Sequence, residues 1–234
     1  EAQPTPYAAY LAFKDQTIAS VSPELFFRLD GDHICMEPMK GTAPRGSSPE
    51  ADTENEQMLR TSLKDQAENL MIVDMIRNDL GRIATPGSIR VTELFKLQPL
   101  PTVWQQTSTI TADSKASLQE ILKALFPCAS ITGAPKHRTM EIIKELESEP
   151  RGPYTGAIGF LHGPRSMRFS VGIRTLILTP DGQAKFGVGS GVVWESTGPG
   201  EWQESLDKAK VLDALGSPEL IETMRFEPDA GVDL

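Results

Sequence analysis

The chain has 234 residues, of which 39% are hydrophobic and 24% are charged, so it can bury a sizeable core without disulfide bonds. A formal net charge of -9 and the lack of any Lys/Arg block argue against nucleic-acid binding, because phosphate binding requires a basic face. Cys35 and Cys128 lie far apart without metal-ligand spacing, and no apolar run approaches the roughly 20 residues of a membrane span. We therefore expect a soluble, cytoplasmic protein that binds neither nucleic acid nor membrane.

The N-terminal part of the chain predicts β-strands. Short apolar stretches are separated by Lys-Asp, Ser-Pro and Asp-Gly-Asp turn signals, a pattern typical of antiparallel strands joined by tight turns. The strands are predicted at residues 7–13, 17–29 and 32–37. Residues 36–46 follow, and their glycines and prolines predict a turn that carries Lys40.

Helices and strands then alternate irregularly. Acidic residues open the segment from Ser48 to Arg77 and its leucines recur near helical spacing, so we expect one long helix or two consecutive ones. Further helices are predicted at residues 114–126, 135–147 and 200–215, and β-like runs at residues 87–111 and 154–195. This order favours an α+β fold of antiparallel sheets over a doubly wound parallel sheet.

Two of these helical segments carry glutamates that suit a hard cation. Glu68 lies in the first and Glu204 in the last, with Glu201 as a third or water-mediated ligand. Mg²⁺ takes only one or two protein carboxylates alongside waters and an anionic ligand. The alternative is that all three are solvent-exposed glutamates on helix faces, which composition alone favours.

Several ordered motifs stand out along the chain. The first is a helix with the sequence Ala67-Glu68-Asn69-Leu70-Met71-Ile72-Val73-Asp74-Met75-Ile76-Arg77-Asn78-Asp79-Leu80-Gly81, and two more motifs follow at residues 126–136 and 154–159. They resemble the signatures of one family, the chorismate-utilising enzymes, which include anthranilate, isochorismate, salicylate and aminodeoxychorismate synthases. The similarity continues through residues 172–175, 187–194 and 201–208. It implies an anthranilate-synthase-like sandwich of antiparallel sheets flanked by helices, with Asp74, Arg77, Asn78 and Asp79 pinning a helix end.

The resemblance also implies a domain organisation. Residues 1–215 correspond to the C-terminal portion of a chorismate-binding catalytic domain, so the fold is expected to be N-terminally incomplete. Residues 216–234 resemble a linker and the opening strand of a pyridoxal-phosphate-dependent aminodeoxychorismate lyase, with a plain C-terminal tail as the alternative. The Trp104-Gln105 and Val193-Trp194 pairs resemble the synthase subgroup that is fused to such a lyase.

Carried over by position, the resemblance makes Glu68 and Glu204 ligands of Mg²⁺ and Glu24 the general acid beside the departing ring hydroxyl. A glutamate in that role needs a raised pKa, which burial beside Phe26 can supply. The alternative for Glu24 is a surface carboxylate at a strand end.

The resemblance assigns the substrate contacts as well. Arg174 and Lys208 would grip a substrate carboxylate, the arginine through its planar fork and the lysine as a point charge, unless both form ordinary salt bridges. Backbone N–H groups of a glycine-rich turn would cradle an anion, although such a turn also suits a tight strand bend. The remaining contacts are hydrogen bonds from side chains and backbone. These groups are Gly189, Ser190 and Gly191 for the cradle, and Gly41, Thr42, Ser130 and Tyr154 for the hydrogen bonds.

The chain departs from the family at Gln105, where many relatives have a histidine before the Ser-Thr pair. A glutamine cannot transfer a proton near neutral pH, so only hydrogen bonding to the substrate is expected of it.

Lys40 stands where most of the family carries alanine, and a lysine there marks the aminodeoxychorismate synthase branch. The resemblance then implies conversion of chorismate and ammonia to 4-amino-4-deoxychorismate, in 4-aminobenzoate and folate biosynthesis, through a covalent intermediate on Lys40. The ammonia would come from a separate glutamine amidotransferase subunit, because the chain has no Cys–His amidotransferase signature. The alternatives are a turn lysine in water, anthranilate or isochorismate synthesis on the same scaffold, and a non-catalytic chorismate-binding module.

Overall fold

The computed structural model describes residues 5–100, 103–194, 196–215, 226–227 and 231–232. The chain divides into two compact units. We call Ser22–Gly172 the central unit, and residues 1–21 with 173–234 the terminal unit.

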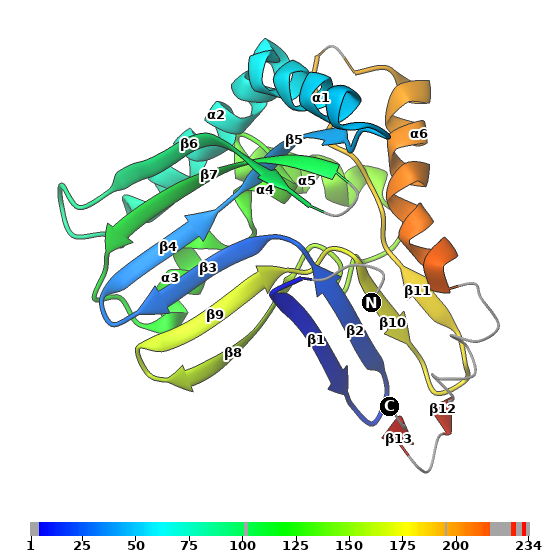
Figure 1. The fold of residues 1–234 in the computed structure, drawn as a ribbon. Coiled ribbons are helices and arrows are strands. Elements are labelled where there is room, and N and C mark those ends of the chain that lie inside the picture. Colours follow the sequence, from blue (N-terminus) through cyan, green and yellow to red (C-terminus); the bar gives the residue numbers. More distant parts are fainter. Residues whose placement is uncertain (1–4, 101–102, 195, 216–225, 228–230, 233–234) are drawn as a thin grey trace. The chain divides into compact units, whose positions relative to one another are not determined.

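A seven-stranded sheet forms the central unit, with strand order β5-β7-β4-β3-β9-β8 and β6 paired to β7 (Figure 1). All of its pairings are antiparallel, as the sequence predicts. The stretch predicted as one strand over residues 17–29 is two strands, because Pro23 and Glu24 separate them. The strands of the sheet are β3 (Leu25–Asp30), β4 (His33–Glu37), β5 (Met39–Pro44), β6 (Arg90–Pro99), β7 (Val103–Asp113), β8 (Ala157–Gly163) and β9 (Ser166–Val171).

The turn predicted around Lys40 is wrong, because this segment is strand β5. Its register against β7 shifts between Met39 and Thr42, so Lys40 and Gly41 form a bulge. Gly41 has φ +85°, and a Cβ there would come within 2.9 Å of the Cβ of Asp65. The glycine therefore marks a bulge pressed against a helix rather than a chain reversal.

Two consecutive helices, α1 (Pro49–Thr61) and α2 (Leu63–Leu80), realise the second of the two predicted alternatives. Ser62 separates them and caps α2, since its side chain accepts a hydrogen bond from the Asp65 N–H. Helix α3 (Leu118–Leu125) begins with a capping box of Ser117 and Glu120. The short helix α4 (Ala129–Thr132) was not expected, and α5 (Lys136–Leu146) lies within its predicted range.

Helix α2 packs against β5 and β7 and buries Ile72, Val73, Ile76 and Leu80. On β7 the alternate residues Gln106, Ser108, Ile110 and Ala112 are buried, and the Ser108 hydroxyl donates to Asn69 of α2 at 2.5 Å. Phe27 is fully buried and stacks on Phe169 with ring centroids 5.0 Å apart. Burial of one such side chain contributes about 1.5–3 kcal/mol, so the buried side chains of α2 and the sheet together contribute much of the stability of the unit.

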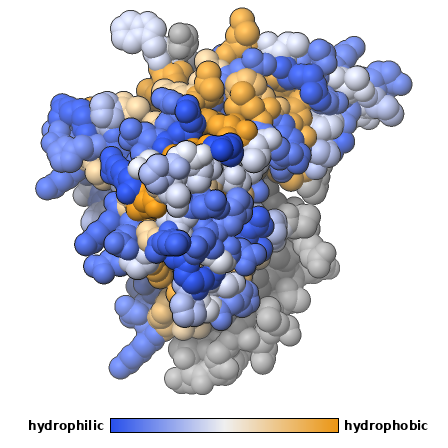
Figure 2. Space-filling view, turned by 90° about the vertical axis from the view of Figure 1, so that its left-hand side faces the viewer, coloured by the Kyte–Doolittle hydropathy of each residue, from blue (hydrophilic) through white to orange (hydrophobic). Residues whose placement is uncertain are grey.

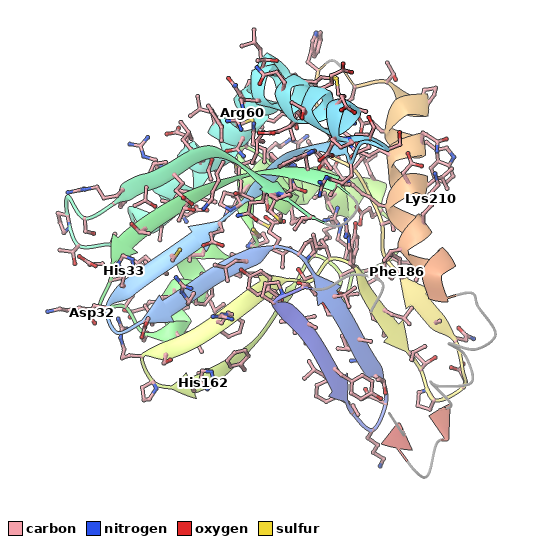
Figure 3. All side chains as sticks on the ribbon, viewed as in Figure 1. Asp32, His33, Arg60, His162, Phe186 and Lys210 are labelled. Atoms are coloured by element: carbon pink, nitrogen blue, oxygen red, sulfur yellow. The ribbon has the colours of Figure 1, made fainter. Side chains whose placement is uncertain are left out.

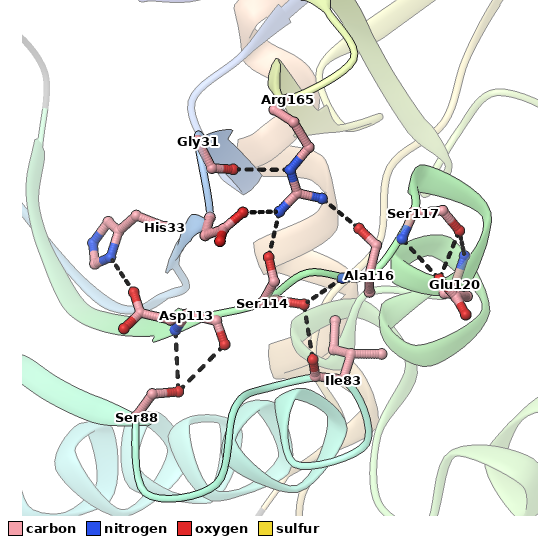
Figure 4. Close-up of polar contacts among 11 residues, drawn as sticks. Gly31, His33, Ile83, Ser88, Asp113, Ser114, Ala116, Ser117, Glu120 and Arg165 are labelled. Carbon is pink, nitrogen blue, oxygen red and sulfur yellow. Dashed lines mark hydrogen bonds and ion pairs between the residues drawn. The ribbon is translucent and has the colours of Figure 1, made fainter.

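Arg165 ties three loops of the central unit together (Figure 4). Its guanidinium donates to the carbonyl oxygens of Gly31 at 3.1 Å, Ala116 at 2.6 Å and Ser114, and it pairs with Asp32 at 3.1 Å. Asp32 itself lies in the β3–β4 turn (Figure 3). One side chain thus satisfies backbone acceptors that belong to no strand or helix ladder.

Exposed apolar side chains occur on the helices of the central unit. Met58 of α1 and Leu63, Leu70 and Met71 of α2 are all at least 43% exposed. On the face shown in Figure 2, apolar side chains gather in the upper part and hydrophilic ones cover most of the rest.

The terminal unit contains a four-stranded sheet of order β1-β2-β10-β11. Its strands are β1 (Tyr7–Ala12), β2 (Thr17–Ser22), β10 (Thr175–Leu178) and β11 (Ala184–Phe186). Phe186, at the end of β11, is labelled in Figure 3.

Helix α6 (Gly198–Ala209) has Thr197 as its N-cap. The helix predicted to reach residue 215 ends earlier, because the chain tightens into the 3₁₀ segment η1 (Lys210–Leu215), whose first residue, Lys210, is labelled in Figure 3. The prediction for residues 216–234 lies mostly outside the described residues. Within this range the structure describes β12 (Phe226–Glu227) and β13 (Gly231–Val232), which pair with each other. In the part of the chain that the structure describes, no helix combines the length and apolarity needed to cross a membrane.

Candidate active site

Glu24, Lys40 and Ser130 come together in the central unit although they are far apart in sequence. The Ser130 hydroxyl donates to Oε1 of Glu24 at 2.6 Å. The backbone N–H of Met39 also donates to the Glu24 carboxylate, and the charge of Lys40 acts on it. Glu24 directly precedes β3, Lys40 lies on β5 and Ser130 lies on α4, so three separate elements contribute one residue each.

Glu24 is only 4% exposed, and its backbone is held on both sides. Its N–H donates to the Ser22 hydroxyl at 3.3 Å, and its carbonyl accepts from the Val171 N–H at 3.1 Å. Burial raises the pKa of Glu24 to about 6, and the hydrogen bond from Ser130 and the charge of Lys40 oppose that rise only in part. A carboxyl group with this pKa is about one tenth protonated at pH 7, whereas one with the ordinary pKa of 4.5 is almost fully ionised, so Glu24 is better suited to act as a general acid. The predicted alternative of a surface carboxylate is therefore wrong.

Gln105 uses both ends of its side-chain amide on the β5 bulge. Its Nε2 donates to the Gly41 carbonyl at 2.8 Å, and its Oε1 accepts from the Thr42 hydroxyl at 3.3 Å. Gln105 and Thr42 are direct partners across β5 and β7. A residue expected to contact the substrate is thus engaged with the backbone next to Lys40, which a glutamine can do because it offers a donor and an acceptor together.

A buried ion pair between Lys136 and Asp79 fixes the segment that follows Ser130 to the end of α2. Lys136 lies 2.6 Å from Asp79, at the end of α2, and also donates to the Leu125 carbonyl at 2.8 Å. This confirms the helix-pinning role predicted for Asp79, while Arg77 pairs with Asp74 at 3.1 Å on the exposed side. Cys128, which sequence reasoning left without a role, lies 3.2 Å from the Ser130 hydroxyl.

Tyr154 precedes a turn that depends on close backbone approach. Thr155 has φ +63°, and its N–H donates to the Gly172 carbonyl at 2.7 Å. A Cβ on Gly172 would come within 2.2 Å of the Pro153 carbonyl oxygen, so only glycine fits. Burial raises the pKa of Tyr154, whose hydroxyl is therefore a neutral donor at physiological pH.

The predicted metal ligands divide between the two units. Glu68, on α2 of the central unit, has a side chain 22% exposed, and Lys64 lies 3.9 Å away. Glu201 and Glu204 lie three residues apart on α6 of the terminal unit, a spacing that places both on one helix face. Among the described residues no group of three His, Cys, Asp or Glu side chains is arranged for a metal. Carboxylate oxygens are donors that Mg²⁺ prefers, so each of these glutamates suits the cation by its chemistry.

The cations predicted to bind a carboxylate are in the terminal unit and differ in their surroundings. Lys208 pairs with Glu204 at 2.7 Å and donates to the Gly189 carbonyl at 3.0 Å, so it ties α6 to the Gly189-Ser190-Gly191 segment. Arg174 is half-buried with φ +49°, and it has no ion-pair partner among the described residues. Burial lowers the pKa of Arg174. A strained, unpaired arginine is the more specific sign of a binding role.

An open basin of about 490 Å³ lies elsewhere on the central unit. Its lining residues are Arg82, Ile83, Ala84, Thr85, Lys115, Ala116 and Glu120, and they include none of the predicted site residues. The basin therefore does not mark the site built around Glu24.

Comparison with known proteins identifies the family of this chain. Residues 1–214 match the model of a family described as chorismate binding enzyme. Aminodeoxychorismate synthase component 1 of Salmonella typhimurium is 48% identical over 205 residues, which are 87% of this chain and 45% of that protein. The component 1 of Escherichia coli is 45% identical over 89% of this chain and 46% of its own length.

A solved structure gives the same result for the fold. Anthranilate synthase component I from Streptococcus pneumoniae matches with a TM-score of 0.80 and 33% identity, over 89% of this chain and 46% of that one. The predicted α+β, anthranilate-synthase-like fold is thus confirmed. The chain spans about half the length of the curated relatives it matches.

Proposed function

The chain belongs to the chorismate binding enzyme family, and we propose that it forms the catalytic centre of an aminodeoxychorismate synthase. The reaction converts chorismate and ammonia to 4-amino-4-deoxychorismate, the precursor of 4-aminobenzoate in folate biosynthesis. The observation that carries this proposal is Lys40 on a strand bulge beside the buried acid Glu24. The 48% identity with a relative named aminodeoxychorismate synthase component 1 supports it.

Each of the two residues has a defined part in the reaction. Lys40 must first give up its proton; its amine then adds at C2 of chorismate, the two ring double bonds shift, and the C4 hydroxyl takes the proton of Glu24 and leaves as water. Ammonia then adds at C4, the double bonds shift back, and the Lys40 amine leaves. Nucleophilic catalysis in this form divides one difficult displacement into two easier ones.

The other predicted residues bind and orient the substrate. Glu68 and Glu204, with Glu201 as a third or water-mediated ligand, would hold Mg²⁺, which when bound neutralises the ring carboxylate of chorismate. Arg174 and Lys208 would bind a substrate carboxylate, and the backbone of Gly189, Ser190 and Gly191 would donate to it. Tyr154 would donate from its hydroxyl, and Gln105 would act through Gly41 and Thr42.

The proposal includes partners and a compartment. A glutamine amidotransferase subunit would supply the ammonia, in line with the component 1 in the names of the relatives. The Trp104-Gln105 and Val193-Trp194 pairs support a fused aminodeoxychorismate lyase domain after residue 215. We place the protein in the cytoplasm because Cys35 and Cys128 are both free thiols.

Two rivals share the family. Anthranilate or isochorismate synthesis would use the same scaffold, and Lys40 argues against both, since direct displacement needs no nucleophilic amine there. A non-catalytic chorismate-binding module would have no use for a buried carboxyl group with a pKa of about 6.

Intact-protein mass spectrometry tests the proposal. The full-length protein is incubated with chorismate and Mg²⁺ without ammonia, and we expect an added mass of chorismate less one water on Lys40, which ammonia then removes. Lys40→Ala should form no adduct and lose ammonia-dependent product by several orders of magnitude, whereas the surface variant Lys115→Ala should behave as wild type. Turnover without an adduct would support the synthase activity but contradict the nucleophilic role of Lys40. No turnover at all would favour the non-catalytic module.

A further inference from the structure

The carboxyl group of Glu24 has a small set of partners in the described chain. They are the Ser130 hydroxyl at 2.6 Å, the Met39 N–H and the charge of Lys40. Phe26, two residues after Glu24, is 1% exposed and contacts the ring of Phe126 edge-on, with centroids 6.4 Å apart. In such apolar surroundings a single hydrogen bond has a large influence on which protonation state is favoured.

The Ser130 hydroxyl is held between two groups. On one side lies Oε1 of Glu24, and on the other lies Sγ of Cys128 at 3.2 Å, where either atom can be the donor. Cys128 is 3% exposed, and burial raises the pKa of its thiol to about 12, so it keeps its proton at any pH of interest. The sulfur can therefore act as a weak donor or a weak acceptor without changing its charge.

This arrangement satisfies both states of the acid. When Glu24 is ionised, the Cys128 S–H donates to Ser130 and the Ser130 O–H donates to the carboxylate. When Glu24 is protonated, its O–H donates to the Ser130 oxygen and the Ser130 O–H turns to the sulfur. No polar atom of the three is left unpaired in either state, and only the Glu24 proton is exchanged with the substrate.

We propose that Ser130 is a positioning residue that orients Glu24 and adjusts its proton affinity, rather than a ligand of the substrate, and that Cys128 is the second partner of its hydroxyl. This inference rests on the proposed function for its catalytic consequence only. The Asp79–Lys136 ion pair supports it, because it fixes the segment from which both side chains project.

The test measures the protonation of Glu24 directly. The carboxyl C=O stretch is followed by infrared difference spectroscopy as a function of pH in the full-length protein, with Glu24→Gln used to identify the band. Ser130→Ala removes a donor to the carboxylate, so the titration midpoint should rise by about one pKa unit, or about tenfold in proton affinity. Ser130→Thr keeps the hydroxyl and should titrate near wild type. A Ser130→Ala midpoint equal to that of wild type would overturn the proposal.

Kinetics separate positioning from substrate binding. A general acid must be protonated, so the rate falls as pH rises through its pKa, and Ser130→Ala should move this alkaline limb of kcat/KM upward with little change in KM for chorismate. A raised KM with an unmoved limb would make Ser130 a substrate ligand and sink the inference. If wild type fails to convert chorismate, the proposed function fails, while the infrared titration still decides the role of Ser130.

Discussion

The side-chain amide of Gln105 donates a hydrogen bond of 2.8 Å to the carbonyl oxygen of Gly41, on the strand bulge that carries Lys40. Lys40 precedes this carbonyl by one residue, so the amide holds the backbone next to Lys40, the proposed nucleophile. The amide does this without a change of tautomer, because its NH₂ donates to Gly41 while its oxygen accepts from the Thr42 hydroxyl. The glutamine is thus a structural solution to the bulge.

Replacing Gln105 by methionine keeps the size of the side chain and removes both hydrogen bonds. We expect the free energy of unfolding to fall by about 0.5–1.5 kcal/mol. The rate of ammonia-dependent product formation should fall by about 10- to 100-fold, because a small displacement of a reacting group is costly. Urea unfolding and steady-state kinetics measure the two effects, and wild-type values for both would show that the clamp on Gly41 is dispensable.

At Gln106, the adjacent residue, we expect the same substitution to stabilise the protein rather than destabilise it. It is fully buried, and neither polar atom of its side chain has a hydrogen-bond partner among the described residues. A buried polar group without a partner costs about 1–3 kcal/mol, so Gln106→Met should raise the free energy of unfolding by an amount in that range. Urea unfolding of the two methionine variants side by side provides the matched comparison. Equal destabilisation by both would mean that Gln106 is satisfied in solution.

Glu24 makes stability depend on pH in a predictable direction. Its pKa is about 6 in the folded protein against an ordinary value of 4.5, so the folded state binds the proton more tightly. The stabilisation from this proton is fully present below pH 4.5 and is lost as pH rises through 6, a loss of about 2 kcal/mol by pH 8.

Glu24→Gln removes this dependence. The variant should be about 2 kcal/mol more stable than wild type at pH 8, with the difference shrinking toward pH 4, while its synthase activity is lost because an amide has no proton to give. Thermal or urea unfolding across pH gives the comparison. Glu54→Gln on the exposed side of α1 controls for the amide substitution itself. A difference that stayed constant with pH would contradict the raised pKa.

For the buried ion pair of Asp79 and Lys136 we expect the effects of the two substitutions on the free energy of unfolding to be strongly non-additive. Lys136→Met leaves the Asp79 carboxylate, only 5% exposed, without its partner, and should cost about 3–5 kcal/mol. Combining it with Asp79→Leu should recover much of that loss, because no unpaired charge then remains in the core. The exposed pair Arg138 and Glu141, at 2.9 Å on α5, is the control and should show coupling below about 1 kcal/mol. Additive losses at Asp79 and Lys136 would rule out the coupling.

The local patterns of the chain were sufficient for most of its helices and strands and for its family. Helical spacing of leucines and the cap at Ser62 encode α1 and α2, and alternating apolar runs with turn residues encode antiparallel strands, because these signals act within a few residues. The ordered motifs identified the chorismate-binding family in the same way.

Other features depend on partners distant in the chain. Residues 39–44 read as a turn because Gly41 and Pro44 are turn residues, yet pairing with β7 some sixty positions later makes them a bulged strand. The end of α6 at Ala209 likewise could not be predicted from the helical spacing of its residues. Strand pairing is decided by which surfaces bury each other, and a local window does not contain that information.

The resemblance of the ordered motifs to the chorismate-utilising enzymes was enough to predict Glu24, Lys40 and Ser130 as site residues, because such motifs can be recognised without the fold. Their mutual relation required the folded chain: Ser130 reaches Glu24 across 106 positions, and burial among apolar side chains raises the pKa of the acid. A pKa is set by the free energy of a charge in its surroundings, and those surroundings exist only once distant segments have packed around it.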